Sequence, residues 1–126
     1  GGEEDAKSLV AEYVLDHQIV SERFEGDAEL LGEVVEIFLE DCPKLMADLW
    51  SAISRGDSGA LERAAHALKG SVGNFAARAA FEAAYGLEKM GREGDLGRVD
   101  EAHAELELEI ERLCAALPAL TEEEAP

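Results

Sequence analysis

The chain of 126 residues is predicted to be all-α, an antiparallel four-helix bundle with an additional short N-terminal helix or helices. Alanine and leucine are abundant, aromatic residues make up only 6% of the chain, and runs of β-branched residues are short, which favours helix over sheet. Apolar residues recur at helical spacing in several stretches, and the connections between these stretches are short. Neighbouring helices are therefore expected to run antiparallel.

The N-terminal part is expected to hold a short helix and then, over residues 19–24, its continuation or a separate turn. The apolar pattern of this first helix is made by Leu9, Val10, Tyr13, Val14 and His17. Gly26 interrupts the pattern, and Asp27 is a suitable N-cap for the next helix. We divide the chain into a linker or short helix over residues 1–15, a four-helix-bundle domain over 16–117, and a frayed, solvated tail over 118–126.

Five amphipathic stretches follow Asp27. Their apolar stripes are Leu30, Leu31, Val34, Val35, Phe38 and Leu39; Leu45, Met46, Leu49, Trp50 and Ile53; Leu61, Ala65, Leu68, Val72 and Phe75; Phe81, Ala84, Leu87 and Glu88; and Val99, His103, Leu106, Ile110, Leu113 and Leu117. Pro43 suits the first turn of the second stretch, and Pro118 closes the last. Gly56 is expected to end one helix, and Asp57 or Ser58 to cap the next. Phe38 and Trp50 are predicted in the core, and His103 at its edge.

Acidic residues outnumber basic ones by 29 to 11, which gives a net charge of −18. Such a surface repels phosphate backbones and anionic lipids, so binding to nucleic acid or to a membrane surface is not expected. The charge serves solubility or matches a partly basic protein partner. No apolar run reaches the roughly 20 residues needed to cross a bilayer, and no signal peptide is visible, so a cytoplasmic location is expected.

Cysteines and histidines give no metal-ligand spacing, because all five lie far apart in the sequence. Cys42 and Cys114 fall at apolar helix positions outside any CxxC pattern, which predicts buried free thiols in a reducing compartment. His17 is expected to be a surface residue. No metal site is predicted.

His66 lies about 140° from Leu61 on a helical wheel, away from the apolar stripe. Its neighbours on the helix surface include Lys69, Gly70 and Gly73. Each glycine costs about 1 kcal/mol in a helix interior, and their absence of side chains would leave the imidazole accessible to a large, blunt partner. Two structural explanations stay open, namely that Gly70 ends the helix or that it lets another helix approach closely. The lysine would help to hold an anion.

The run His66 to Ser71, followed by Asn74 to Ala77, resembles the signature of histidine-containing phosphotransfer (HPt) domains, and the resemblance covers about residues 16–115. It implies that His66 accepts a phosphoryl group from a receiver-domain aspartate and passes it to another receiver. It also implies that Lys69 stabilises the phosphohistidine and that Gly70 clears space for docking. Ser71, Gly73 and Arg92 are carried over as supporting residues.

The sequence departs from the family pattern at two positions. Ala76 stands where many relatives have glycine, which should alter helix packing little. Glu88 stands where some relatives place a glutamine near the histidine. A carboxylate there could repel phosphate, so we assign Glu88 no role.

The resemblance implies a phosphoryl carrier without enzymatic activity and without a cofactor of its own, with magnesium in the partner receiver domain. The partners would be receiver domains and possibly a histidine kinase in the same polypeptide, and the chain is expected to be a monomer. Ala67 stands where the dimerisation helices of sensor kinases usually carry an acidic residue, which argues against a kinase phosphoacceptor domain that works directly with an ATP-binding domain. The alternative function is a helical protein-interaction module without phosphotransfer activity. A metal-dependent enzyme lacks supporting residues.

Overall fold

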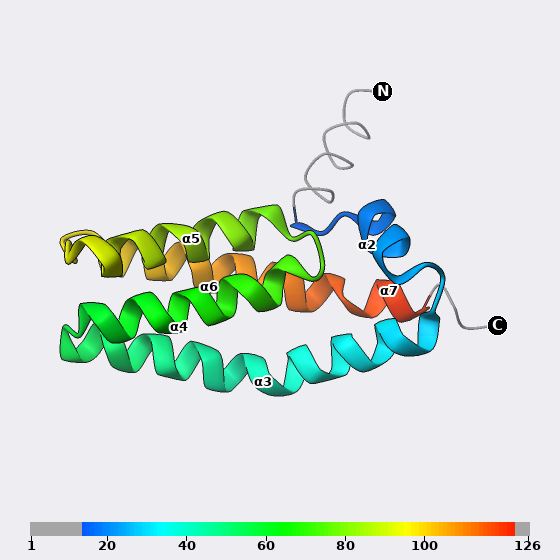
Figure 1. The fold of residues 1–126 in the computed structure, drawn as a ribbon, viewed down its shortest axis with the longest axis horizontal. Coiled ribbons are helices and arrows are strands. Elements are labelled where there is room, and N and C mark those ends of the chain that lie inside the picture. The colour runs from blue at the N-terminus through cyan, green and yellow to red at the C-terminus, as the bar shows by residue number, and fades with distance from the viewer. Residues whose placement is uncertain (1–13, 123–126) are drawn as a thin grey trace, which may run out of the picture.

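The computed structural model describes residues 14–122, and these residues form helices and short connections without a strand. The helices are α2 (His17–Phe24), α3 (Ala28–Arg55), α4 (Ser58–Gly73), α5 (Arg78–Glu93), α6 (Val99–Ala116) and α7 (Pro118–Glu122). Helices α3 to α6 run antiparallel as a four-helix bundle, with α2 and α7 at one end (Figure 1). The predicted all-α bundle is therefore confirmed. Most of the predicted first helix lies outside the described residues, and His17 begins α2.

The caps that the sequence predicted are present. The side chain of Asp27 accepts a hydrogen bond from Leu30 N at 2.9 Å and begins α3. Gly56, with φ 65°, ends α3, and Asp57 then begins α4 by accepting from Ala60 N at 3.0 Å. A left-handed φ favours glycine, so Gly56 suits the short connection that turns α4 back along α3.

The break predicted at Pro43 is wrong, because α3 is one helix of 28 residues with Pro43 inside it. A proline in a helix interior removes one backbone hydrogen bond and costs about 3 kcal/mol. Here the buried positions keep a helical spacing of three, four or seven residues through the proline: Leu31, Val35, Phe38, Cys42, Leu49 and Ala52 are all buried. Packing of both halves against one core outweighs the local cost.

The apolar stripe of α4 is confirmed without exception. Leu61, Ala65, Leu68 and Val72 of α4, and Phe75 in the turn that follows it, each have 0% of their surface exposed. The ring of Phe75 packs edge-on against Phe38 of α3, with centroids 5.3 Å apart. The helix is thus held firmly on one face, and its opposite face is left to solvent.

The predicted core was too wide at some positions. Trp50 is 51% exposed, and Leu30, Leu39 and Phe81 are exposed as well. In a four-helix bundle each helix buries a narrow seam, so apolar residues beside that seam stay at the surface. Trp50 covers the ring of His103, with centroids 4.9 Å apart, and His103 is buried at the core edge as predicted.

Helices α4 and α5 pack closely because Gly91 has no side chain. A Cβ at this position would lie 2.6 Å from Glu62 N and 2.7 Å from Ser58 O, both backbone atoms of α4. Real Cβ atoms do not come this close, so a larger residue would push the helices apart. This contact places the residues of α5 next to the exposed face of α4.

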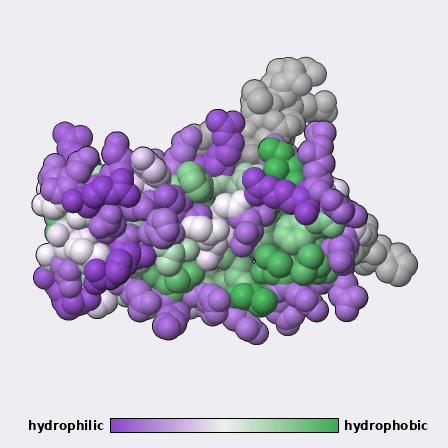
Figure 2. Space-filling model, in the orientation of Figure 1, coloured by the Kyte–Doolittle hydropathy of each residue, from purple (hydrophilic) through white to green (hydrophobic). Residues whose placement is uncertain are grey.

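The chain after Leu117 differs from the predicted solvated tail. Residues Pro118–Glu122 form α7, and Leu120 is buried against the end of the bundle. Residues 123–126 of the predicted tail lie outside the described part. Figure 2 shows apolar side chains gathered over the end that carries α2 and α7, whereas the other end is mostly polar. None of the helices within residues 14–122 is long and apolar enough to cross a membrane.

Candidate functional site

His66 projects from α4 into solvent, with 69% of its side-chain surface exposed, as the helical wheel predicted. Its Nδ1 atom lies 2.8 Å from Oε2 of Glu88, which comes from α5. The Glu88 side chain is only 3% exposed. A buried carboxylate of α5 thus contacts one nitrogen of an exposed imidazole of α4.

Three side chains contact the Glu88 carboxylate. Lys69 Nζ lies 2.7 Å from Oε1, and Arg92 Nη2 lies 3.3 Å from Oε2, beside the contact with His66. Oε1 has no hydrogen bond of regular geometry among the described residues, so the ion pair with Lys69 supplies its partner. Contact with Lys69, and next with His66, holds the pKa of Glu88 below its ordinary value although burial opposes this. The carboxylate is therefore ionised at neutral pH.

Arg92 ties this cluster across to α4. Its Nε atom lies 3.0 Å from Oε2 of Glu62, one turn before His66. The charges of Lys69 and Arg92 thus offset those of Glu88 and Glu62. The repulsion of phosphate that the sequence suggested for Glu88 is compensated locally by these contacts.

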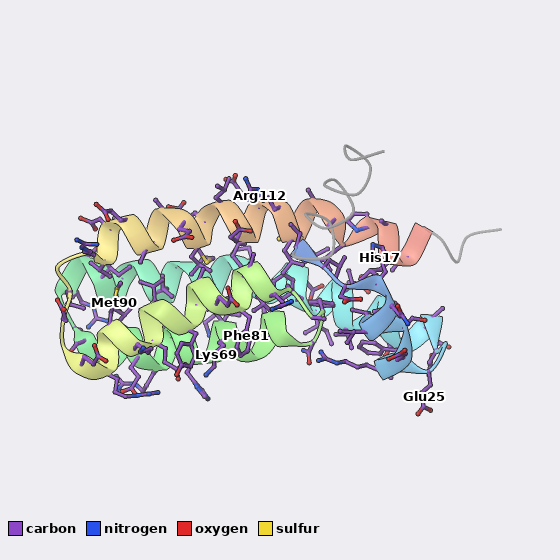
Figure 3. All side chains as sticks on the ribbon, turned by 90° about the horizontal axis from the view of Figure 1, so that it is seen from above. His17, Glu25, Lys69, Phe81, Met90 and Arg112 are labelled. Atoms are coloured by element: carbon purple, nitrogen blue, oxygen red, sulfur yellow. The ribbon has the colours of Figure 1, made fainter. Side chains whose placement is uncertain are left out.

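Lys69 lies one turn after His66 on α4 and against aromatic rings of α5. It is 18% exposed, and its Nζ atom is 5.0 Å from the ring centroid of Tyr85 and 5.7 Å from that of Phe81. Figure 3 shows Lys69 and Phe81 together on one side of the bundle, away from Arg112 of α6. The lysine is thus fixed by one carboxylate and two aromatic faces.

The two glycines beside His66 differ in their surroundings. Gly70 is exposed inside α4, and a Cβ there would meet nothing within 4 Å. It neither ends the helix nor admits another helix, so both structural explanations for Gly70 fail. Gly73 ends α4, and a Cβ there would touch the Phe81 ring at 3.8 Å. Ser71 is half-buried, and its carbonyl accepts from Asn74 N at 3.3 Å.

The contact with Glu88 selects the tautomer of His66. An ionised carboxylate can only accept a hydrogen bond, so Nδ1 carries the proton and Nε2 keeps a free lone pair. Nε2 is not hydrogen bonded to any of the residues that the structure describes. An oriented imidazole with one free nitrogen is the arrangement of a nucleophile. No group of three or more metal-ligating side chains occurs within residues 14–122.

A four-helix bundle that presents an oriented, solvent-facing histidine on a convex face defines a carrier that meets another macromolecule, since a small substrate would be bound in a concave pocket. The family model of the Hpt domain matches residues 33–116. The chain belongs to the Hpt domain family, and it functions as a phosphoryl carrier in phosphorelay.

Among solved structures, the chain is similar to the histidine-containing phosphotransfer protein B (HptB) from Pseudomonas aeruginosa PAO1. The TM-score is 0.80 at 23% identity, and the match covers 86% of this chain and 95% of that one. This likeness supports the fold. A comparison with curated protein sequences found no match.

Glu88 is the residue at this site to which sequence reasoning assigned no role. Its position on the apolar stripe of α5, beside Leu87, is the signal that could have identified it. A glutamate at a core-facing position is almost never fully buried without a paired charge. That rule points to a cationic partner from a neighbouring helix, which here is Lys69.

Proposed function

We propose that His66 is the phosphoacceptor and that Nε2 is the atom that receives the phosphoryl group. The observation that carries this proposal is the 2.8 Å contact of Nδ1 with the buried Glu88 carboxylate. This contact turns the ring so that Nε2, the nitrogen opposite Nδ1, faces away from the carboxylate. Among the described histidines, His103 is buried and His17 has no contact of this kind.

In the proposed step the Nε2 lone pair attacks the phosphorus of a receiver aspartyl phosphate. The N–P bond forms as the P–O bond to the aspartate breaks, and the aspartate leaves as a carboxylate. Because Nδ1 keeps its proton, the phosphorylated ring carries a formal positive charge, which the Glu88 carboxylate stabilises. Transfer to a second receiver is the reverse of this step.

Lys69 is proposed to stabilise the phosphoryl group while it remains paired with Glu88. An ammonium group has three donors, and one of them faces Glu88 Oε1 at 2.7 Å. The others are available to the oxygens of a phosphoryl group on His66, which lies one helical turn before Lys69 on α4. Arg92 is proposed to support this indirectly, by holding Glu88 and Glu62 in place.

The receiver domain is proposed to dock over the exposed face of α4 at Gly70 and along a neighbouring groove. Residues of α2, the end of α4, the α4–α5 turn and α5 line this groove, among them Ile19, Gly73 and Phe81. Ile19 and Phe81 are exposed, and Gly70 leaves the way to the imidazole open. The partner would bring the magnesium ion and the acidic pocket that phosphoryl transfer requires.

We further propose that the chain acts in the cytoplasm as a monomer, with a histidine kinase as a partner or in the same polypeptide. Its many negative charges disfavour association with a second copy of itself.

Incubation with a phosphorylated receiver domain tests the assignment of His66. We expect acid-labile, alkali-stable phosphate on the wild-type chain and on His17→Gln, and none on His66→Gln. Because His17 is also exposed, His17→Gln is a matched control for the loss of a surface imidazole. Label that persists in His66→Gln would overturn the assignment. Absence of label with every receiver tested would favour an interaction module without transfer.

A further inference from the structure

Arg23 of α2 donates a hydrogen bond to the carbonyl oxygen of Gly73, the last residue of α4. The same oxygen also accepts from Ala76 N at 3.3 Å, and a carbonyl has lone pairs for both donors. Carbonyl groups at the C-terminus of a helix carry partial negative charge and favour a cation. The last turn of α4 holds no basic residue of its own. A guanidinium from another helix, 50 positions earlier in the sequence, therefore takes this place.

The two residues joined by this hydrogen bond line the groove proposed for receiver docking, together with Ile19 of α2 and Phe81 of α5. Figure 1 shows α2 beside the turn that joins α4 to α5. Ile19 is 39% exposed and Phe81 is 38% exposed, so each helix presents an apolar side chain to solvent here. Ile19 precedes Arg23 by one helical turn and lies on the same face of α2. The place of Ile19 relative to Phe81 thus depends on how α2 is held.

The groove continues the face of α4 on which His66 lies. Gly73 follows His66 by seven residues, which puts it about 20° away on a helical wheel and about 10 Å further along the axis. Gly70 lies between them on the same face and carries no side chain. An ordinary protein interface covers about 800 Å² of each partner, which is enough to include both features. A protein bound over His66 would therefore also cover the groove.

We propose that Arg23 is a positioning residue for receiver docking, and that the groove takes an apolar side chain of the receiver. This role rests on the proposed phosphotransfer through His66. Arg23 acts through α2, because its hydrogen bond to α4 holds Ile19 in place beside Phe81. An apolar side chain that loses its water between these two residues would supply much of the affinity.

Titration of the full chain with an unphosphorylated receiver domain measures docking without transfer. The probe is the receiver that labels the wild-type chain fastest. We expect Arg23→Ala to weaken binding about 10-fold, and Arg23→Lys, which keeps a donor for the carbonyl, to weaken it about 3-fold or less. Arg112→Ala is the matched control, because Arg112 is an exposed arginine of α6 on another side of the bundle (Figure 3). If Arg23→Ala and Arg112→Ala bind equally well, Arg23 does not position the docking surface.

A small phosphoryl donor separates docking from chemistry. In phosphoramidate the bond from phosphorus to nitrogen breaks as the bond to the histidine nitrogen forms, and ammonia leaves after protonation. This donor needs no docking surface, so it should label Arg23→Ala as fast as the wild type. A phosphorylated receiver should label Arg23→Ala about 10-fold more slowly at low receiver concentration and equally fast at saturation. Slow labelling by both donors would show that Arg23 acts on the histidine itself, which contradicts the proposal.

Ile19→Ala tests whether Arg23 acts through α2. Ile19 is an exposed position, so this variant should fold normally and bind the receiver about 3- to 10-fold more weakly. Wild-type affinity in Ile19→Ala would remove the groove from the interface, even if Arg23→Ala folds poorly. The double variant should bind no more than about 2-fold more weakly than Arg23→Ala, because Ile19 contributes little once α2 is not held. Additive losses would show that Arg23 contacts the receiver directly and would overturn the positioning role.

The positioning role and the proposed function can fail separately. Label that persists in His66→Gln would contradict phosphotransfer through His66. Binding of the unphosphorylated receiver to the Arg23 and Ile19 variants is measured without any transfer, so it decides the positioning role whichever residue carries the phosphate.

Discussion

The buried carboxylate of Glu88 accepts a hydrogen bond from Nδ1 of the exposed His66 across the α4–α5 interface. This relationship joins the best-packed helix pair of the bundle to the one histidine of the described residues that the fold both exposes and orients. A rigid second helix thereby controls the tautomer and direction of a side chain that would otherwise rotate freely in solvent.

Replacement of Glu88 by glutamine should slow phosphoryl transfer to His66 about 10-fold. A hydrogen bond to a charged group contributes about 1–2 kcal/mol more than a neutral one. The glutamine variant lacks this extra stabilisation at the step in which the phosphorylated ring becomes cationic. Single-turnover transfer from a phosphorylated receiver measures the rate. Glu93→Gln, an exposed glutamate of the same helix, is the control and should transfer normally. Equal rates in the two variants would remove Glu88 from the mechanism.

The stability of the fold at acidic pH should depend on Glu88. Its pKa is lower in the folded chain than the unfolded value of about 4.3, so its contribution is complete above that pH and is lost as the pH falls through the folded pKa. Protonation of the other carboxylates relieves the repulsion between negative charges and therefore raises the stability of the fold as the pH falls.

The difference between wild type and Glu88→Gln isolates the Glu88 contribution. Urea unfolding between about pH 3 and pH 6 measures it. We expect the stability advantage of the wild type over this variant to shrink as the pH falls. A difference that is constant across this range would show that the Glu88 carboxylate has no special stabilisation in the folded chain.

Gly70 is predicted to lower the stability of the fold and to give a receiver domain access to His66. Gly70→Ala should stabilise the fold by about 0.5–1 kcal/mol, since its Cβ meets nothing. Gly70→Gln should remain folded and transfer slowly, because its side chain stands where a receiver docks. Gly86 is a matched control, as it lies inside α5 in a groove facing α6 and its Cβ would also meet nothing. If Gly70→Gln and Gly86→Gln transfer equally fast, Gly70 does not serve access.

Gly91 should behave in the opposite way to Gly70. Gly91→Ala places a methyl group against the α4 backbone at Glu62 and Ser58, and we expect a loss of about 1–3 kcal/mol in unfolding free energy. It should also slow transfer, because Glu88 moves with α5. Thermal unfolding and the transfer assay measure the two effects. A variant as stable as the wild type would show that α4 and α5 are not held this closely.

Much of the fold could be predicted because it depends on local patterns. The stripe from Leu61 to Phe75 determined which face of α4 is buried, and Asp57 determined where that helix begins. Helix lengths were harder to predict. The propensity of Pro43 to break a helix is local, whereas the packing that overrides it involves the whole bundle. The exposure of Trp50 was missed because spacing alone does not give the width of the buried seam.

The site was predictable in part for the same reason. The exposure of His66 and the nearness of Lys69 and Gly70 follow from the geometry of one helix. The roles of Glu88 and Gly91 depend on how α5 packs on α4, which no single-helix pattern contains. Ala76 shows a similar limit. We expected its methyl group to matter little for packing, but its φ of 51° lies in the region where glycine is favoured, which is a property of the turn.

The central claim is that His66 carries phosphate on Nε2 while Glu88 holds Nδ1. NMR of the phosphorylated chain with nitrogen-labelled histidine tests it, because the phosphorus–nitrogen coupling identifies the bonded atom. We expect coupling to Nε2 of His66 and a proton retained on Nδ1. Coupling to Nδ1, or phosphate on another residue, would contradict the account.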